Sequence, residues 1–387
     1  MNLSVTAPPG SGQTSLPAST PKLQSIQGLR FYAAMMVLIF HLPHVGGTEP
    51  PFYLAWTKIY FASGVRLFFE ISAFTLMYST LRYIEQKDWI KIYAIRRFAR
   101  IAPLFYCFVG LNAVLNYVYF GQSLDWSVVL NLSFLFNFYA DTIETISSSV
   151  WAGWTIGAEM VFYGFLPLLL GILTGLRPAL VFLIVGIMIS YAGIVAPHAA
   201  PYPFIPVQMA FPTQIQFFAW GVLAYWLYKR WQAPGLRHPR ALEFGLVAMF
   251  VACVICMSFI HLKPAGSSIA LLYFVDGPLY FSVCLLQALF PWGFFSNRFV
   301  AFWGERSFSI YLVHGPVLIH AKPLYEWLVQ KLGSDAGYFA SLALSITIIL
   351  AISAVTYWAI ERPGMRAGAR LVAKMGWMGA KPATAIA

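Results

Sequence analysis

The chain alternates between long apolar runs and short polar segments along almost its whole length. Each apolar run is close to the roughly 20 residues that a helix needs to cross a hydrocarbon core of about 30 Å. The pattern therefore predicts an all-α polytopic membrane protein with about ten transmembrane helices. The expected spans are residues 26–45, 59–81, 101–120, 151–173, 179–196, 208–228, 241–262, 267–290, 305–322 and 338–360.

Three further segments fall outside these ten spans, one inside the membrane domain and one at each end of the chain. Residues 126–139 are apolar but short and contain two asparagines, which favours a re-entrant or interfacial segment, with a further span as the alternative. Residues 1–25 are rich in Ser, Pro, Thr and Gly, which is typical of a disordered tail. Residues 364–387 form a basic tail. The membrane domain is expected to cover residues 26–363.

Composition and charge agree with this picture. Hydrophobic residues make up 59% of the chain and charged residues only 10%, which excludes an ordinary soluble domain. The net charge of +11 comes from basic residues scattered between the spans, so it indicates membrane topology and not a nucleic-acid partner. With ten spans, the basic segments 82–100, 229–240 and the C-terminal tail fall on one side. The positive-inside rule then places both termini in the cytoplasm.

The first span carries two ionisable side chains, Arg30 and His41. A helix turns about 100° and rises about 1.5 Å per residue, so the two lie within roughly 20° of one face and about 16 Å apart along it. Ionisable groups inside a membrane usually face the bundle interior and are functional candidates. The structural alternatives stay open: Arg30 can extend to lipid headgroups, and His41 can be a hydrogen-bonded core residue.

Six segments of the chain form a recognisable series. They are GLRFYAAMMVLIFH (28–41), GVRLFFEISAFTLMYS (64–79), RRFARIAPLFY (96–106), WTIGAEMVFYGFLPLL (154–169), GERSFSIYLVHGPV (304–317) and WAIERP (358–363). The first of them has an arginine and a histidine with ten residues between them. In this order the segments resemble the integral-membrane acyltransferase 3 family, and the resemblance covers residues 26–363.

The resemblance implies an enzyme of the cytoplasmic (inner) membrane that modifies a polysaccharide or related molecule by O-acetylation. The acyl donor would be acetyl-CoA or another acyl-CoA. The acceptor would be a hydroxyl of an extracytoplasmic glycan, glycolipid or small molecule, reached among membrane lipids.

The chemistry of acyl transfer assigns roles to the intramembrane charges. A neutral imidazole can remove the proton of an attacking hydroxyl at neutral pH, so His41 is the expected general base, with Arg30 on the cytoplasmic side. Glu159 is expected at a similar depth to His41, where it can orient the imidazole or bind the acceptor hydroxyl. A buried pairing of Glu159 with an arginine is the structural alternative.

Three arginines at the start of the third span, Arg96, Arg97 and Arg100, suit the phosphates of acyl-CoA because guanidinium groups bind phosphate in a bidentate manner. Juxtamembrane arginines also serve simply as topology anchors. The sequence therefore predicts a phosphate-binding cluster and leaves the anchor role open.

Further candidates would line the acceptor side. His314 and Tyr311 can line the same cavity as His41 or form a hydrogen bond between helices. Trp154 and Tyr163, together with Trp151, can form a platform for a sugar or act as ordinary interfacial anchors. No metal site is predicted, because the four cysteines lie in apolar runs without a second ligand pair.

Two local pairings are also expected. Arg66 and Glu70 are four residues apart on a helix and can pair where the family usually has an acidic residue and a valine. Glu361 and Arg362 precede Pro363 and are expected to end the last helix and pair with each other.

A secondary transporter of a small polar solute or glycan precursor, and a glycan-binding scaffold, remain alternative functions.

Overall fold

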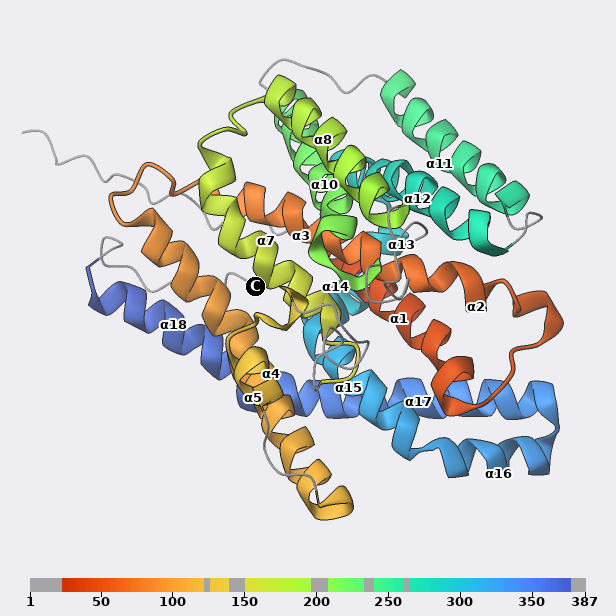
Figure 1. The fold of residues 1–387 in the computed structure, drawn as a ribbon. Helices are drawn as coiled ribbons and strands as arrows, with labels where there is room; N and C mark the ends of the chain where they lie inside the picture. Colours follow the sequence, from red (N-terminus) through yellow and green to blue (C-terminus); the bar gives the residue numbers. More distant parts are fainter. Residues whose placement is uncertain are drawn as a thin grey trace, which may run out of the picture.

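The computed structural model describes residues 23–121, 126–138, 150–195, 208–232, 240–260 and 265–376, and every regular element in them is helical. The predicted all-α class is therefore confirmed for this part of the chain (Figure 1). The elements are α1 (Gln24–Gly46), η1 (Phe52–Leu54), α2 (Thr57–Tyr60), η2 (Phe61–Ser63), α3 (Gly64–Thr80), α4 (Trp89–Phe120), α5 (Trp126–Leu132), η3 (Phe136–Phe138), α7 (Trp154–Leu170), α8 (Leu176–Val195), α10 (Phe211–Trp231), α11 (Arg240–Ile260), α12 (Ala265–Leu289), α13 (Gly293–Ser296), α14 (Arg298–Glu305), α15 (Ser307–His320), α16 (Lys322–Leu332), α17 (Ser334–Thr356), a π-helical turn (Tyr357–Glu361) and α18 (Arg362–Lys374).

Seven helical segments in the described residues are long and apolar enough to cross a membrane, and they match seven of the ten expected spans. The other three spans correspond to α7, α10 and α15. Helix α7 has 17 residues and helix α15 has 14. The 14 residues of α15 rise about 21 Å, and both helices are shorter than the roughly 20 residues that cross a core of about 30 Å. Helix α10 is long enough but carries two glutamines and two basic residues. The count of ten and the cytoplasmic placement of the termini stay predictions.

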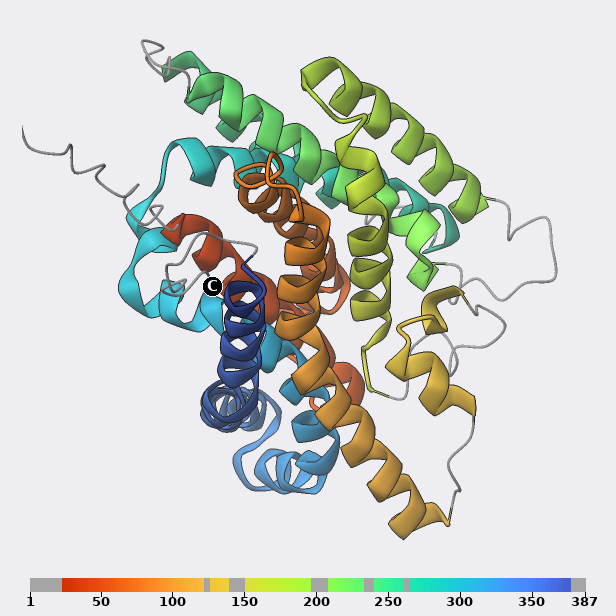
Figure 2. The same cartoon turned by 90° about the vertical axis from the view of Figure 1, so that its left-hand side faces the viewer.

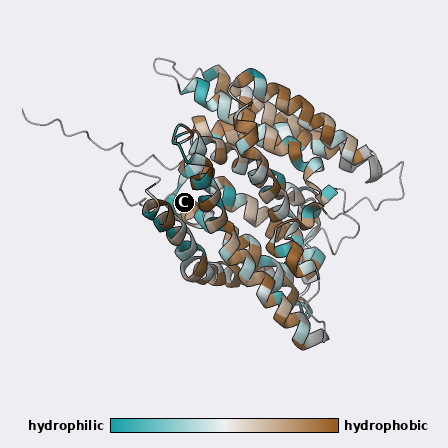
Figure 3. Ribbon diagram, turned by 60° about the vertical axis from the view of Figure 1, so that its left-hand side comes forward, coloured by the Kyte–Doolittle hydropathy of each residue, from teal (hydrophilic) through white to brown (hydrophobic). Residues whose placement is uncertain are grey.

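The outward faces of several helices are apolar, as expected for contact with lipid (Figure 3). Helix α8 exposes Leu180, Val181 and Ile184, and α11 exposes Phe244 and Phe259. A soluble chain rarely leaves so much apolar surface in contact with water. The fold therefore supports a multi-pass membrane protein.

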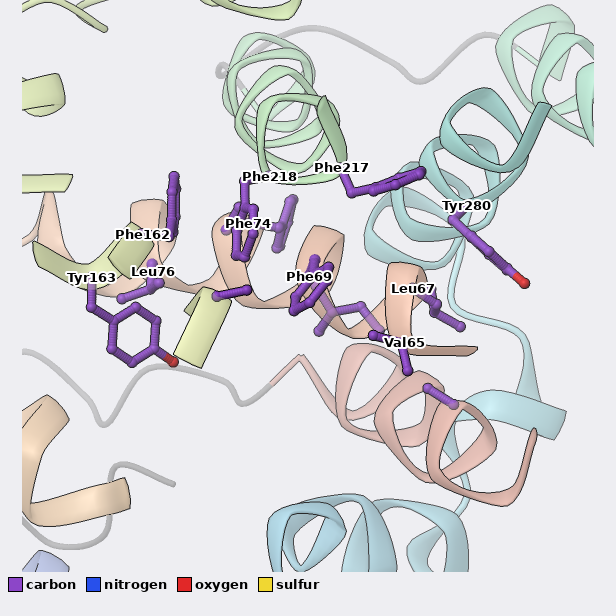
Figure 4. Packing of buried hydrophobic residues seen from close by; sticks show 14 of the residues in the cluster. Val65, Leu67, Phe69, Phe74, Leu76, Phe162, Tyr163, Phe217, Phe218 and Tyr280 are labelled. Carbon is purple, nitrogen blue, oxygen red and sulfur yellow. The ribbon is translucent and has the colours of Figure 1, made fainter. Parts of the chain in front are cut away.

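Helix α3 crosses the centre of the bundle and contacts α1, α7, α10 and α12. In the close view, its buried face carries Phe69 and Phe74 toward α10 (Figure 4). Phe218 of α10 stacks on Phe69 at 4.7 Å and on Phe162 of α7 at 4.3 Å between ring centroids. The stacking of these rings fixes α3 and α7 relative to each other. The polar side chains of the two helices, among them Ser72 and Glu159, are held in contact as a result.

Helix α1 is fixed mainly by α3, α14 and α15. Two glycines allow very close approach: a Cβ at Gly304 would lie 1.8 Å from the carbonyl oxygen of Gln27, and one at Gly28 would lie 1.9 Å from that of Phe295. Small residues at such crossings bring helix backbones together in membranes. The far end of α1 stops at Gly47, whose φ of 73° suits glycine. Both ionisable residues of α1 are therefore held at fixed positions.

Gly304→Ala should destabilise the protein by about 1–3 kcal/mol, because the added methyl group forces α14 away from the backbone of α1. The measurement is thermal unfolding of the purified protein in detergent. Gly245→Ala in α11 is the matched control, since a Cβ there meets no atom within 4 Å. Equal unfolding temperatures for the two variants would show that the α1–α14 contact is looser than described.

The predicted basic C-terminal tail begins as a helix. Helix α17, the π-helical turn and α18 run on continuously from Ser334 to Lys374, and α18 lies beside α4 in both views (Figures 1 and 2). Gly364 and Gly368 face α4, whereas Arg366 and Arg370 are exposed. The expectation that Glu361 and Arg362 end the last helix is therefore wrong. The predictions for residues 1–22 and 377–387 lie outside the described residues.

The segment 126–139 forms the seven-residue helix α5 and the short turn η3 in its described part, residues 126–138. Seven residues rise only about 10 Å, so α5 cannot cross a membrane by itself. The side chain of Asn137 joins this segment to the bundle: it donates to the carbonyls of Trp154 and Met209 and accepts from the backbone N–H of Phe211. Its re-entrant character stays a prediction.

Candidate active site

The inward face of α1 points its arginine at α3. Nη2 of Arg30 donates to the hydroxyl of Thr75 at 2.8 Å, and that hydroxyl donates in turn to the carbonyl of Ile71. The guanidinium also lies close enough to Glu159, Arg97 and Arg100 to interact with them electrostatically. Arg30 therefore faces the bundle interior, and the alternative of extension to lipid headgroups does not describe it.

Glu159 of α7 lies in the middle of this polar region. Its carboxylate accepts hydrogen bonds from the hydroxyls of Ser72 and Tyr163, which are themselves 3.3 Å apart. Tyr163 is one turn further along α7, so both side chains lie on the same face of that helix. Figure 4 shows Tyr163 extending from α7 beside α3. The expected site residues Arg30, Glu159 and Tyr163 are thus brought together.

Ser72, Thr75 and Ser79 on α3 were not singled out from the sequence, although each contacts one of the candidates. Ser72 holds Glu159, Thr75 holds Arg30, and Ser79 accepts from Arg97 at 2.9 Å. They recur every three or four residues in an otherwise apolar run, so they form one polar stripe on a helix. That spacing was the available signal.

His41 lies at the other end of the α1 face, in a cluster of three rings that we call the histidine cluster: His41, Trp151 and His314. The ring centroid of His41 is 4.5 Å from that of Trp151 and 5.3 Å from that of His314, and Trp151 is 5.3 Å from His314. Nδ1 of His41 is buried and has no hydrogen-bond partner among the described residues, although the carbonyl of Val37 is on the preceding turn. No described side chain therefore holds this nitrogen in a hydrogen bond.

The second imidazole is held in a defined orientation by its own helix. Nδ1 of His314 contacts the carbonyl of Tyr311, and its Nε2 is buried without a hydrogen-bond partner in the described residues. A donor at Nδ1 leaves Nε2 as the nitrogen that carries the lone pair. His314 is thus held in one orientation within the histidine cluster, and its role in lining a shared cavity stays a prediction.

Tyr311 connects the histidine cluster to the Glu159 region. Its hydroxyl accepts from Thr155 at 2.9 Å and donates to the carbonyl of Ala152 at 3.0 Å, while its ring centroid is 5.2 Å from that of His314. It also lies within electrostatic range of Glu159. Polar groups therefore run from the arginine end of α1 to the histidine end, supplied by α1, α3, α7 and α15.

The three arginines of α4 have different surroundings. Arg100 pairs with the buried Glu361, with 3.2 Å between Nη1 and Oε1, and Arg96 lies over the ring of Tyr83 at 5.2 Å. Arg97 donates to Ser79, and its Nε is buried without a hydrogen-bond partner in the described residues. Neither Arg30 nor Arg97 forms an ion pair with a described carboxylate. Of the expected cluster, Arg97 thus has no carboxylate partner among the described residues, and Arg30 of α1 is a second guanidinium group in the same situation.

The two tryptophans of the expected aromatic platform lie apart. The ring of Trp154 packs edge-on against Phe69 at 6.1 Å, inside the α3 core, whereas Trp151 belongs to the histidine cluster. Trp151 lies just before α7 and Trp154 is its first residue. Their spacing in the sequence therefore did not show that they enter different environments. Trp151 is the tryptophan that contacts the candidate base.

Both expected local ion pairs are replaced by pairs between distant helices. Arg66 pairs with Asp276 of α12 and lies over the ring of Tyr273 at 3.7 Å, while Glu70 is fully buried and its oxygens have no hydrogen-bond partner in the described residues. Glu361 pairs with Arg100 and accepts from Ser309 at 2.8 Å. Within the described residues, no group of three His, Cys, Asp or Glu side chains could hold a metal ion.

A family model described as an acyltransferase domain matches residues 23–358. The chain is 28% identical over 169 residues to the protein named "Putative acetyltransferase ORF330" of Acidianus two-tailed virus. That match covers 43% of this chain and 48% of the relative, so the likeness spans about half the length of the curated protein. No solved structure matches the chain.

Proposed function

Because the chain belongs to the acyltransferase 3 family, we propose that it moves an acyl group, most simply acetyl, from cytosolic acyl-CoA to a hydroxyl of an extracytoplasmic glycan or glycolipid. The observation that carries the proposal is the layout of α1. Arg30 and His41 both face the bundle interior, about 16 Å apart along the helix, with polar side chains of three other helices between them. One helix thus carries a cation for the donor and an imidazole for the reaction.

Two cations that have no ion-pair partner in the described part of the chain, Arg30 and Arg97, support the proposal that acyl-CoA binds at this end of the site. Acyl-CoA carries several phosphates, and Arg30 and Arg97 offer guanidinium groups suited to bidentate contact with phosphate oxygens. Arg100 is already paired with Glu361, so its role is to hold that end of α4 in place. The pantetheine arm is long and thin, and it would carry the thioester from this end toward His41.

The reaction itself needs a base and a path for one proton. His41 takes the proton of the acceptor hydroxyl as its oxygen bonds to the acyl carbon and the carbon–sulfur bond breaks. The imidazolium then gives that proton to the CoA thiolate, so the products are the ester and CoA. Glu159 lies with Ser72 and Tyr163 near Arg30, which favours a role in holding the arginine end over direct contact with the imidazole.

The test uses inside-out membrane vesicles that contain the protein and are supplied with radiolabelled acetyl-CoA. We expect base-labile label to accumulate in the glycan or glycolipid fraction only when the protein is present. Uptake of a solute without any acylated product would instead favour the transporter. Mass spectrometry of surface glycans from cells with and without the gene would then identify the acceptor by the loss of an acyl group.

Arg97→Gln should raise the KM for acetyl-CoA about tenfold to a hundredfold with a smaller change in kcat, because hydrogen bonds to charged groups contribute about 1.5–3 kcal/mol. Initial rates over a range of acetyl-CoA concentrations measure the effect. Arg366→Gln, on the exposed face of α18, is the control that removes one cationic charge elsewhere. An equal rise in KM for both variants would show that only overall positive charge matters.

A further inference from the structure

Trp151 has no role in the proton transfer, yet three independent features hold it against the histidine cluster. The first is contact: its ring meets both imidazoles nearly edge to face, with interplanar angles of 71° to His41 and 68° to His314. An indole covers a large apolar area, so it keeps water away from the rings that it touches. The base is therefore shielded on this side.

The second feature is the backbone beside Trp151. Ala152 has a φ of 61°, a left-handed conformation that residues other than glycine seldom adopt. Its carbonyl accepts from the hydroxyl of Tyr311, which is itself held by Thr155. Strained backbone of this kind persists where its surroundings fix it, and such positions concentrate at functional sites. Here it sets the direction in which the chain leaves Trp151.

The third feature is the residue under the indole. A Cβ at Gly315 would lie 2.2 Å from Cε3 of Trp151, so the tryptophan can occupy its place only because the residue after His314 has no side chain. The turn at Ala152 precedes α7, and Gly315 belongs to α15. The turn before α7 and the glycine of α15 therefore both restrict the indole to one position.

We propose that Trp151 is a positioning residue that closes the histidine cluster to water and presents the acceptor hydroxyl to His41. This inference rests on the proposed function, because it concerns the nucleophile of the same acyl transfer. When the indole is displaced, water takes the place of the acceptor. The water oxygen then bonds to the acyl carbon, the carbon–sulfur bond breaks, and the proton passes through His41 to the thiolate, giving a free carboxylic acid and CoA.

The experiment measures how label from radiolabelled acetyl-CoA divides between glycan-bound ester and free acetate in inside-out vesicles. For Trp151→Ala we expect the ratio of ester to acetate to fall by on the order of tenfold to a hundredfold, while CoA release continues. Trp151→Phe keeps an aromatic ring and should retain most of the ratio. Gly315→Ala should reproduce the fall although the indole is still present, because the new methyl group displaces it.

The control is Gly164→Ala in α7, where a Cβ meets nothing within 4 Å, and this variant should behave as the unmodified protein. The inference is overturned if ester and free acetate fall in parallel in Trp151→Ala, or if its ratio equals that of the unmodified protein. Thermal unfolding of each variant separates loss of fold from loss of positioning, and Gly315→Ala supplies the test of the ratio if Trp151→Ala does not fold. If the unmodified protein releases no CoA and forms no ester, the proposed function itself fails.

Discussion

His41→Ala should lower acyl transfer from acetyl-CoA by about a hundredfold to ten-thousandfold, the range that a positioned general base contributes. The residue sits half-buried among Trp151 and His314, with Nδ1 free of a good hydrogen bond, so no other described group in direct contact with it can take over its role except His314. The measurement is the initial rate of ester formation in inside-out vesicles. The variant should still insert and unfold at nearly the same temperature.

Two other histidines make this prediction specific. His44→Ala removes an exposed imidazole whose contacts in the described residues are with the carbonyl and the ring of Phe40, on its own helix, so it should leave the rate within about twofold. His314→Ala should cause an intermediate loss, because it removes the neighbour that orients the cluster but leaves His41 in place. If His314→Ala lost all activity and His41→Ala kept it, the base would have to be reassigned to His314.

Glu361→Ala should destabilise the protein by about 3–5 kcal/mol, since it leaves the guanidinium of Arg100 buried without its partner. Glu361 is 0% exposed, and its other oxygen accepts from Ser309, so a hydrogen bond between helices is lost as well. The measurement is the unfolding temperature in detergent. Glu326→Ala, at an exposed position of α16, is the control and should change stability by less than about 0.5 kcal/mol.

A double variant sharpens this second prediction. Replacing both members of a buried ion pair by apolar residues of similar volume is often neutral or stabilising. Arg100→Met with Glu361→Leu should therefore recover most of the stability lost in Glu361→Ala. Near-additive losses would instead show that the two side chains contribute independently. Activity is not expected to recover, because the end of α4 that carries Arg97 loses its charged anchor.

The positions of the long apolar helices could be predicted from the lengths of the apolar runs. The face of α1 that carries candidate site residues could be predicted from helical periodicity. The eleven-residue spacing of Arg30 and His41 places them on one side of α1, and the structure turns that side inward. The polar stripe of Ser72, Thr75 and Ser79 obeys the same rule. Local spacing is sufficient wherever a single helix sets the geometry.

Prediction failed where a partner comes from elsewhere in the chain. Arg66 and Glu70 are close neighbours on α3, but the desolvated guanidinium pairs with Asp276, 210 residues away, because packing of α3 against α12 brings them together. Likewise, the π-helical turn before Arg362 carries Glu361 inward to Arg100. The place of Trp151 depends on Gly315 of another helix, so no spacing within its own segment reveals it.

The backbone contacts of α1 at Gly28 and Gly304 bear on how the two sides of the membrane are connected. Carriers alternate their access by rocking one half of the molecule against the other. The backbone of α1 is in close contact with α13 at Gly28 and with α14 at Gln27, so the helix has little freedom to slide or rotate, and its arginine and histidine keep their positions in the bundle. Under the proposed function, the flexible pantetheine arm of acyl-CoA then carries the acyl group across, while α1 stays in place.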